Sequence, residues 1–136
     1  MSDWHYVCDD YRPDEQAFRE AMFTLGNGYF ATRGAAIEAV ADGRHYPGTY
    51  LAGGYNRLRT EMAGRFIENE DLVNLPNWLP LTIRIGDGDW FHVDHAELRN
   101  YRQILDLAAG VFSRDLEFAD DAGRITRLSE RRLVHL

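Results

Sequence analysis

Hydrophobic and polar positions change from a helical to a β-strand pattern after about residue 23. In residues 13–23, apolar side chains recur at helical spacing behind Asp14, which is placed to cap a helix. The segments that follow are short, rich in aromatic or β-branched residues, and separated by Gly, Asp and Pro. They comprise residues 29–33, 49–55, 81–85, 90–94, 111–118 and 125–134. The pattern predicts a mainly β protein with one short N-terminal helix.

Two of these segment pairs are predicted to form hairpins. Residues 81–94 alternate apolar and polar side chains on both sides of a Gly-Asp-Gly-Asp turn. Residues 111–134 place Phe112, Leu116 and Phe118 on one face before a turn, and then run back. Each hairpin has one polar and one apolar face. The apolar faces need a second layer, which favours an antiparallel β-sandwich.

Residues 35–46 and 57–69 lack clean periodicity, and we expect irregular loops there. The length and hydrophobic content suit one core, so residues 1–136 are interpreted as a single N-terminal β-sandwich domain. The strand-like pattern continues to the last residue, which predicts an incomplete sandwich from a longer chain. Such a sheet exposes edges and an apolar face. We therefore predict a homo-oligomer in which residues 111–118 or 125–134 meet a neighbouring copy, face to face or edge to edge.

Composition narrows the function classes. The formal charge of −7 is spread along the chain and would repel a nucleic-acid backbone. No apolar run approaches the roughly 18 residues of a membrane span, so no membrane partner is expected. Cys8 is the single cysteine, which excludes an internal disulfide and suits the cytoplasm. The chain has no lysine, which removes Schiff-base chemistry and a phosphate-loop lysine.

Three short motifs could indicate a cofactor or metal site, but the sequence around each one argues against that interpretation. Residues 26–31, Gly-Asn-Gly-Tyr-Phe-Ala, satisfy a loose dinucleotide pattern, but they follow a helix and open a strand, so a tight turn is the better interpretation. Asp87 and Asp89 lack the further ligands of a calcium loop. His92 and His95, three apart on strand-like sequence, should point to opposite faces. We expect no cofactor and no metal.

Two segments offer candidate sugar chemistry. Glu61, Glu68, Glu70 and Asp71 form an acidic cluster in which a catalytic carboxylate pair could be sought, although a solvated acidic loop is the commoner explanation. Residues 69–80 are rich in Asn and contain Trp78, which could bind sugar by hydrogen bonding and ring stacking. In the alternative, the Asn side chains cap turns beside prolines while Trp78 and the leucines fill the core.

Three sequence segments together resemble glycoside hydrolase family 65, which includes maltose, trehalose and kojibiose phosphorylases. They are Leu25-Gly-Asn-Gly-Tyr-Phe-Ala-Thr-Arg-Gly34, Pro47-Gly-Thr-Tyr-Leu-Ala-Gly-Gly-Tyr-Asn56 and Leu72-Val-Asn-Leu-Pro-Asn-Trp78. Their order is that of the family's N-terminal region, and later residues such as Leu105, Gly110 and Arg114 resemble its next segment. The resemblance covers essentially the whole chain.

The resemblance implies the front part of a super-sandwich of galactose-mutarotase type. In the family an (α/α) barrel follows and holds the catalytic glutamate and the phosphate site, so no catalytic residue is assigned to this chain. The implied parent enzyme phosphorolyses or hydrolyses α-glucosidic disaccharides by inversion, with inorganic phosphate as a possible co-substrate. The missing barrel is then the expected partner, with an α-glucoside as a possible ligand.

Candidate contacts with another domain or with a sugar are Asn27, Arg33, Glu70, Asn74, Asn77 and Trp78. A rival hypothesis is a stand-alone carbohydrate-binding module in which Trp78, Trp90 and nearby tyrosines form an exposed stacking platform. Exposure of two or more of these rings on one concave face would favour it.

Overall fold

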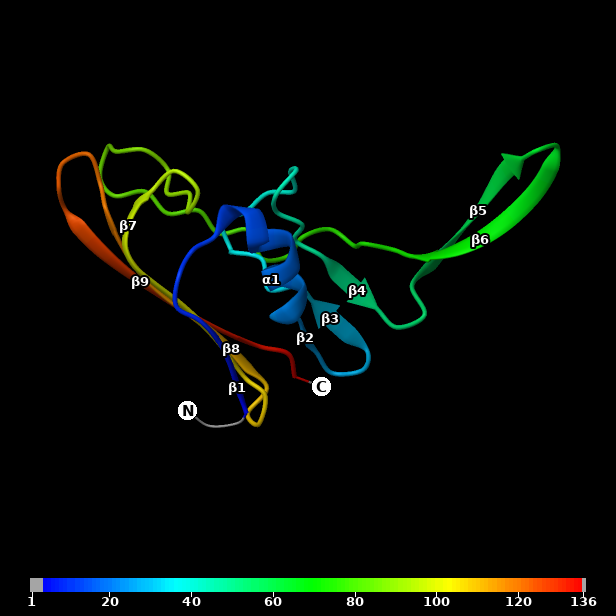
Figure 1. Ribbon diagram of the computed structural model, residues 1–136, viewed down its shortest axis with the longest axis horizontal. Helices are drawn as coiled ribbons and strands as arrows, with labels where there is room; N and C mark the ends of the chain where they lie inside the picture. Colours follow the sequence, from blue (N-terminus) through cyan, green and yellow to red (C-terminus); the bar gives the residue numbers. More distant parts are fainter. Residues whose placement is uncertain (1–3, 136) are drawn as a thin grey trace.

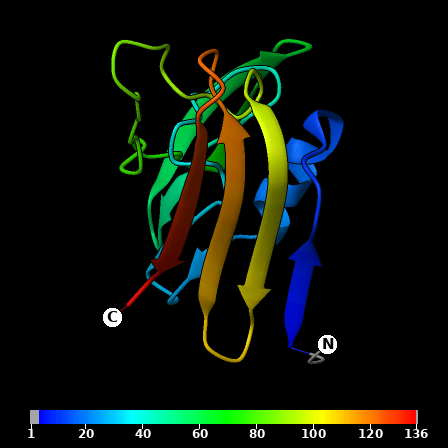
Figure 2. The same ribbon diagram turned by 90° about the vertical axis from the view of Figure 1, so that its left-hand side faces the viewer.

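The computed structural model describes residues 4–135 and is built around a four-stranded antiparallel sheet. Its strands are β1 (His5–Cys8), β7 (Glu97–Asp106), β8 (Val111–Ala119) and β9 (Ile125–Leu133), in the order β1-β7-β8-β9 (Figure 2). Gly110 and Gly123, both with positive φ, close the β7–β8 and β8–β9 turns. The predicted hairpin over residues 111–134 is therefore confirmed.

One face of this sheet carries the core. On β8, Phe112, Arg114, Leu116 and Phe118 are buried and the positions that alternate with them are more exposed. Because β8 pairs with β7 on one side and β9 on the other, residues 111–118 have no free edge to offer a neighbouring copy. That part of the oligomer prediction is wrong in its edge-to-edge form. The other segment, β9, lies at the end of the sheet.

The predicted helix is α1 (Gln16–Met22), preceded by a short 3-10 turn, Pro13–Glu15. Its orientation differs from the prediction. Asp14 lies inside the 3-10 turn rather than capping the helix, and Phe18 is 61% exposed. The inward face is polar and consists of Gln16, Arg19 and Glu20. Ion pairs with residues distant in sequence compensate those charges, so the apolar spacing did not mark the buried face.

A small three-stranded sheet follows the helix, with strands β2 (Leu25–Gly26), β3 (Phe30–Thr32) and β4 (Thr49–Leu51). The Gly-Asn-Gly turn joins β2 to β3, so it lies between two strands rather than between helix and strand. Phe23 and Leu25 at its start pack against Leu105 and Phe112 of the large sheet. Figure 1 shows α1 between the large sheet and the small one.

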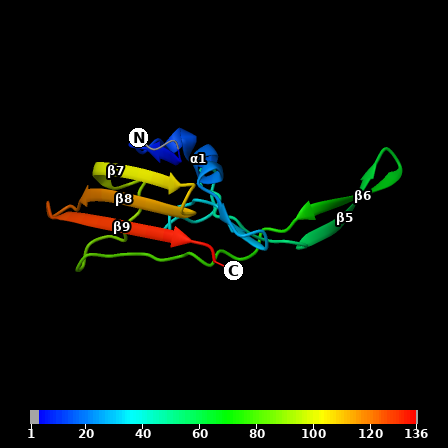
Figure 3. The same ribbon diagram turned by 90° about the horizontal axis from the view of Figure 1, so that it is seen from below.

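Residues 57–69, expected to be a loop, instead belong to a long hairpin of β5 (Tyr55–Met62) and β6 (Arg65–Leu72). We call this hairpin the arm. Every residue of both strands is exposed, and the arm extends away from the rest of the chain (Figures 1 and 3). Because neither face is buried, the sequence carries no clean apolar and polar alternation, which explains the wrong prediction.

The other predicted hairpin, residues 81–94, does not form. Only one isolated bridge, Arg84 to Trp90, links its two halves. Phe91 and Val93 instead pack on Tyr101, Leu116 and Phe118, so this segment covers the large sheet as irregular chain. Residues 35–46 are irregular, as predicted, but several of their side chains are buried. The fold class, mainly antiparallel β with one short helix, is confirmed.

Candidate functional site

Four of the predicted site residues lie around the small sheet, and their polar groups bind backbone. Asn27 Oδ1 accepts hydrogen bonds from the N–H groups of Tyr29 (3.0 Å) and Phe30 (2.8 Å), and its Nδ2 donates to the carbonyl of His135 (2.8 Å). Arg33 Nη2 donates to the carbonyl of Ala17 (2.8 Å). These contacts fix the β2–β3 turn and tie the small sheet to α1.

Asn74 and Asn77 act in the same way. The Oδ1 atom of Asn74 accepts from the N–H of Thr49 (2.9 Å), and that of Asn77 accepts from the N–H of Leu79 (3.0 Å). Leu75 N donates to the Thr49 carbonyl (2.8 Å), so this segment runs beside β4. Asn77 therefore caps a local turn, as the structural alternative to sugar binding predicted, whereas Asn74 binds β4 across 25 residues of sequence.

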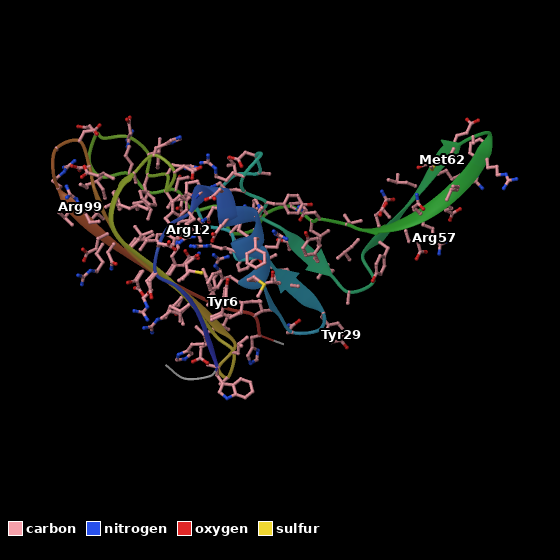
Figure 4. The ribbon with its side chains drawn as sticks, in the orientation of Figure 1. Tyr6, Arg12, Tyr29, Arg57, Met62 and Arg99 are labelled. Carbon is pink, nitrogen blue, oxygen red and sulfur yellow. The ribbon has the colours of Figure 1, made fainter. Side chains whose placement is uncertain are left out.

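Trp78 does not fill the core. It is 53% exposed and meets Phe30 of β3 edge-to-face, with ring centroids 5.9 Å apart. The core role expected for it is therefore wrong. Tyr29, at the tip of the neighbouring turn, is also exposed (Figure 4). The small sheet thus presents aromatic rings that a sugar or another domain could cover.

Glu70 lies apart from this group, on the arm. Its carboxylate pairs with Arg57 (Nη2 to Oε1, 2.7 Å), and Glu68 lies 3.8 Å from Arg59 Nε. In Figure 4, Arg57 lies in the first half of β5 and Met62 marks its last residue. The acidic cluster is therefore a set of exposed carboxylates, of which Glu68 and Glu70 face arginines across the hairpin.

The sequence prediction missed a buried polar cluster centred on His45. Its Nδ1 lies 2.8 Å from Glu20 Oε1 of α1, and its Nε2 lies 3.3 Å from Asp94 Oδ2. Tyr11 donates a hydrogen bond to Asp94, and Arg44 pairs with the same carboxylate at 2.8 Å. The hydrogen bond to Glu20 raises the pKa of His45, although burial opposes it. Burial acts to raise the pKa of Asp94, but its bonds with Tyr11 and Arg44 lower it overall.

A second missed cluster surrounds Arg114, whose side chain is completely buried on the inward face of β8. Its guanidinium donates to both Glu38 oxygens, at 2.9 and 2.7 Å. Glu130 of β9 lies between Arg114 (3.0 Å) and Arg132 (2.6 Å), with charge contacts that lack hydrogen-bond alignment. Arg132 also donates to the carbonyl of Ala35 (2.5 Å). The hydrogen bond and charge of Glu38 raise the pKa of Arg114 against the effect of burial.

These two clusters anchor the irregular residues 35–46 to α1 and to the large sheet. In the first cluster the Tyr11 hydroxyl lies 3.5 Å from His45 Nε2, and the central pairs of both clusters, His45 with Glu20 and Arg114 with Glu38, are buried. Their arrangement suits structural ion pairing rather than chemistry on a substrate. The available signal in the sequence was charge at inward strand positions, such as Arg114 between Phe112 and Leu116. Its partners lie too far along the chain to be identified by spacing.

An open hollow lies where residues 85–97 approach the β8–β9 turn, and Trp90, His92 and His95 contribute to its lining. Trp90 is 60% exposed, with the Arg84 guanidinium 5.1 Å from its ring centroid. His92 and His95 lie side by side at 5.1 Å, because this segment is a turn and not the strand that would have separated them. Within residues 4–135, no three His, Cys, Asp or Glu side chains are grouped to hold a metal ion.

Among the described residues, no helix is long and apolar enough to cross a membrane.

Residues 7–136 match the profile of "Glycosyl hydrolase family 65, N-terminal domain". An uncharacterized glycosyl hydrolase of Mycobacterium tuberculosis is 46% identical over 98% of this chain and 10% of its own length. A kojibiose phosphorylase of Caldanaerobacter subterraneus is 34% identical over 96% of this chain and 16% of its own length.

The structure of a putative kojibiose phosphorylase from the human microbiome superposes with a TM-score of 0.73 and 25% identity, covering 85% of this chain and 16% of that one. The chain thus spans between 10% and 16% of the length of the proteins named here. The family model covers nearly every residue, and the superposition extends the match to the fold. The chain belongs to the N-terminal domain family of glycosyl hydrolase family 65.

Proposed function

We propose that this chain is the non-catalytic N-terminal domain of an enzyme that cleaves α-linked glucose disaccharides by phosphorolysis or hydrolysis. The observation that carries the proposal is the family match over residues 7–136 of a chain that spans only 16% of a related kojibiose phosphorylase. The domain supports the catalytic barrel and the assembly of the enzyme. The enzyme would need no cofactor, and inorganic phosphate would be its co-substrate if it is a phosphorylase. A reducing cytoplasm suits its single Cys8.

The carboxyl groups support a non-catalytic role. An inverting glycosidase needs a carboxylic acid whose pKa is raised so that it can protonate the leaving oxygen. In this chain, six carboxyl groups have a pKa held below its ordinary value by hydrogen bonds from arginine, tyrosine, histidine or backbone groups. They are Asp10, Glu15, Asp42, Asp94, Asp106 and Asp120. Such groups stay ionised at neutral pH and are poor acids.

The exposed rings around the small sheet are the proposed contact with the barrel or with an α-glucoside. Trp78, Phe30 and Tyr29 offer apolar area, while Asn27, Arg33, Asn74 and Asn77 hold the backbone beneath them. Since the amides already bind backbone, the surface offers shape and ring faces rather than free polar groups. That chemistry fits a domain interface better than a specific sugar site.

A graft tests the supporting role. Residues 7–136 would replace the matching segment of the Caldanaerobacter subterraneus kojibiose phosphorylase, and release of glucose 1-phosphate would be measured from kojibiose, maltose and trehalose. We expect the chimera to keep activity on kojibiose, because on this proposal the residues that select the disaccharide lie outside this domain. A Trp78→Ala version should lose thermal stability. A folded chimera that prefers another disaccharide would contradict the proposal, since the domain would then select the substrate.

A carbohydrate-binding module is the second candidate, because Trp78 and Trp90 are both exposed. However, Trp78 lies against Phe30 while Trp90 lies beside Arg84 at the hollow, so they do not share one lining. Titration of the chain with a soluble α-glucan should leave tryptophan fluorescence unchanged if the first proposal holds. Saturable quenching that Trp78→Phe or Trp90→Phe abolishes would favour the binding module.

A further inference from the structure

Within residues 4–135, the arm has a free strand edge and no second layer. Its two strands form a sheet of their own, all of whose residues are exposed, and an isolated two-stranded hairpin is only marginally stable in water. Figures 1 and 3 show the arm reaching away from the rest of the chain, where a partner has access to it. We propose that β5 pairs with β5 of a second copy of this chain, antiparallel and centred on Thr60. This inference rests on the arm itself and not on the proposed function.

The edge of β5 that faces away from β6 carries backbone N–H and C=O groups that can pair with a second strand. Ala63 and Gly64, both with positive φ, form a two-residue turn, so Met62 and Arg65 are the first hydrogen-bonded pair of the ladder. The alternation of an antiparallel ladder then sends the N–H and C=O groups of Arg59 and Glu61 outward. Those groups can pair with the same groups of a second β5.

The side chains of β5 are self-complementary in this register. With Thr60 opposite Thr60 of the second copy, Arg59 faces Glu61 and Leu58 faces Met62, each twice by symmetry. Shifting the centre to Arg59 would place the two copies of that arginine against each other. The Thr60 register therefore matches opposite charges and joins the apolar side chains Leu58, Met62 and Ile67 into one strip on the combined sheet.

Two other free edges, those of β6 and β9, are less suited. The β6 strand carries Glu68, Glu70 and Asp71, so a β6–β6 pairing would gather negative charge. The β9 strand exposes Arg127 and Arg131 along its length, and like charges of this kind protect an edge from pairing. The acidic and basic edges thus disfavour self-pairing, while β5 carries charges of both signs, with Glu61 following Arg57 and Arg59.

Charge swaps test the register. Sedimentation velocity of the chain from about 1 µM to about 1 mM should show a monomer–dimer equilibrium. Arg59→Glu or Glu61→Arg creates two like-charge contacts and should weaken the dimer by about tenfold or more, and the double variant should restore it. Arg57→Glu is the matched control: it breaks the 2.7 Å pair with Glu70 within the arm but faces no charge of the second copy.

A cysteine placed on the symmetry axis gives an independent readout. In a Cys8→Ser background, Thr60→Cys should form an intermolecular disulfide, because the facing Cα atoms would lie about 4.5 Å apart. Leu58→Cys should not, since its two copies would be about 13 Å apart. A monomer at every concentration, equal cross-linking of both cysteines, or a dimer insensitive to Arg59→Glu and Glu61→Arg would overturn the proposal. In that case, the arm binds a different partner.

Discussion

Arg114 of β8 and Glu38 of the irregular segment form a two-pronged ion pair, with N–O distances of 2.9 and 2.7 Å, in which both side chains are almost completely buried. The pair joins positions 76 residues apart and holds the irregular segment against the sheet. Buried charges are tolerated when they are paired in this way, and the loss of one partner leaves the other uncompensated.

Replacing Arg114 should therefore cost much more than replacing an exposed arginine of the same sheet. We expect Arg114→Leu to lower the free energy of unfolding by about 3–5 kcal/mol, because Glu38 and Glu130 keep buried negative charge. Arg127→Leu, which removes an exposed pair with Glu117, should cost less than about 1 kcal/mol. Urea unfolding followed by far-UV circular dichroism measures both. Equal losses would show that the buried cluster is not an anchor.

The His45 cluster predicts a loss of stability on the alkaline side. Its pKa is raised in the folded protein, so its contribution is complete below about pH 6.5 and is lost as pH rises through the folded value. Asp94, whose pKa is lowered, contributes above about pH 4 and loses this contribution as pH falls. The unfolding free energy should decline above pH 6.5 with a slope of up to about 1.4 kcal/mol per pH unit.

A His45→Gln variant provides the control for that slope. It should be less stable at pH 6, since Glu20 and Asp94 lose a cation, and nearly flat between pH 6.5 and 8.5. Urea titrations at several pH values measure both curves. Parallel slopes in the wild type and the variant would assign the pH dependence to other groups.

Gly34 lies where the chain after β3 passes close to the end of α1. Its N–H donates to the carbonyl of Glu20 (2.8 Å), and a Cβ at this position would lie 2.3 Å from Phe23 Cβ and 3.0 Å from Phe23 O. We expect Gly34→Ala to destabilise by about 1–3 kcal/mol through this clash. Gly43→Ala, with nothing within 4 Å, should stay within about 0.5 kcal/mol of the wild type. Thermal denaturation distinguishes the two, and similar melting temperatures would contradict the packing.

Ala63 has a φ of 51° in the turn of the arm, a conformation that favours Asn or Gly. Ala63→Asn should stabilise the arm by about 1 kcal/mol and slow amide hydrogen exchange in β5 and β6. The exchange of β7 and β8 amides, far from the turn, serves as the internal reference. Unchanged or faster exchange in the arm would mean that the turn adopts another conformation.

The strand β8, which has one buried face, was predictable from the sequence, whereas β7, which also has one, and the arm, which has none, were not predicted as strands. The alternation of Phe112, Leu116 and Phe118 correctly identified β8, because each lies inward. The arm gave no such signal because both of its faces meet solvent. Phe91 and Val93 alternate like a strand, yet they cover the sheet as irregular chain. Local alternation reports burial, and it does not report strand pairing.

The candidate site shows the same limit. Turn chemistry beside prolines predicted the local cap that Asn77 forms, whereas the bond from Thr49 to Asn74 spans 25 residues and was not predicted. The exposure of Trp78 depends on which side of the small sheet the segment crosses, and no local pattern records that. The clusters at His45 and Arg114 join partners 25 and 76 residues apart, so only the tertiary structure reveals them.

The most direct test of a non-catalytic domain is the release of glucose and glucose 1-phosphate by the purified 136-residue chain from maltose, trehalose and kojibiose, with and without inorganic phosphate. We predict no release above the buffer blank, because the described carboxylates are paired or exposed and form no acid–base pair. Turnover of any of these disaccharides that Glu70→Gln abolishes would contradict the account.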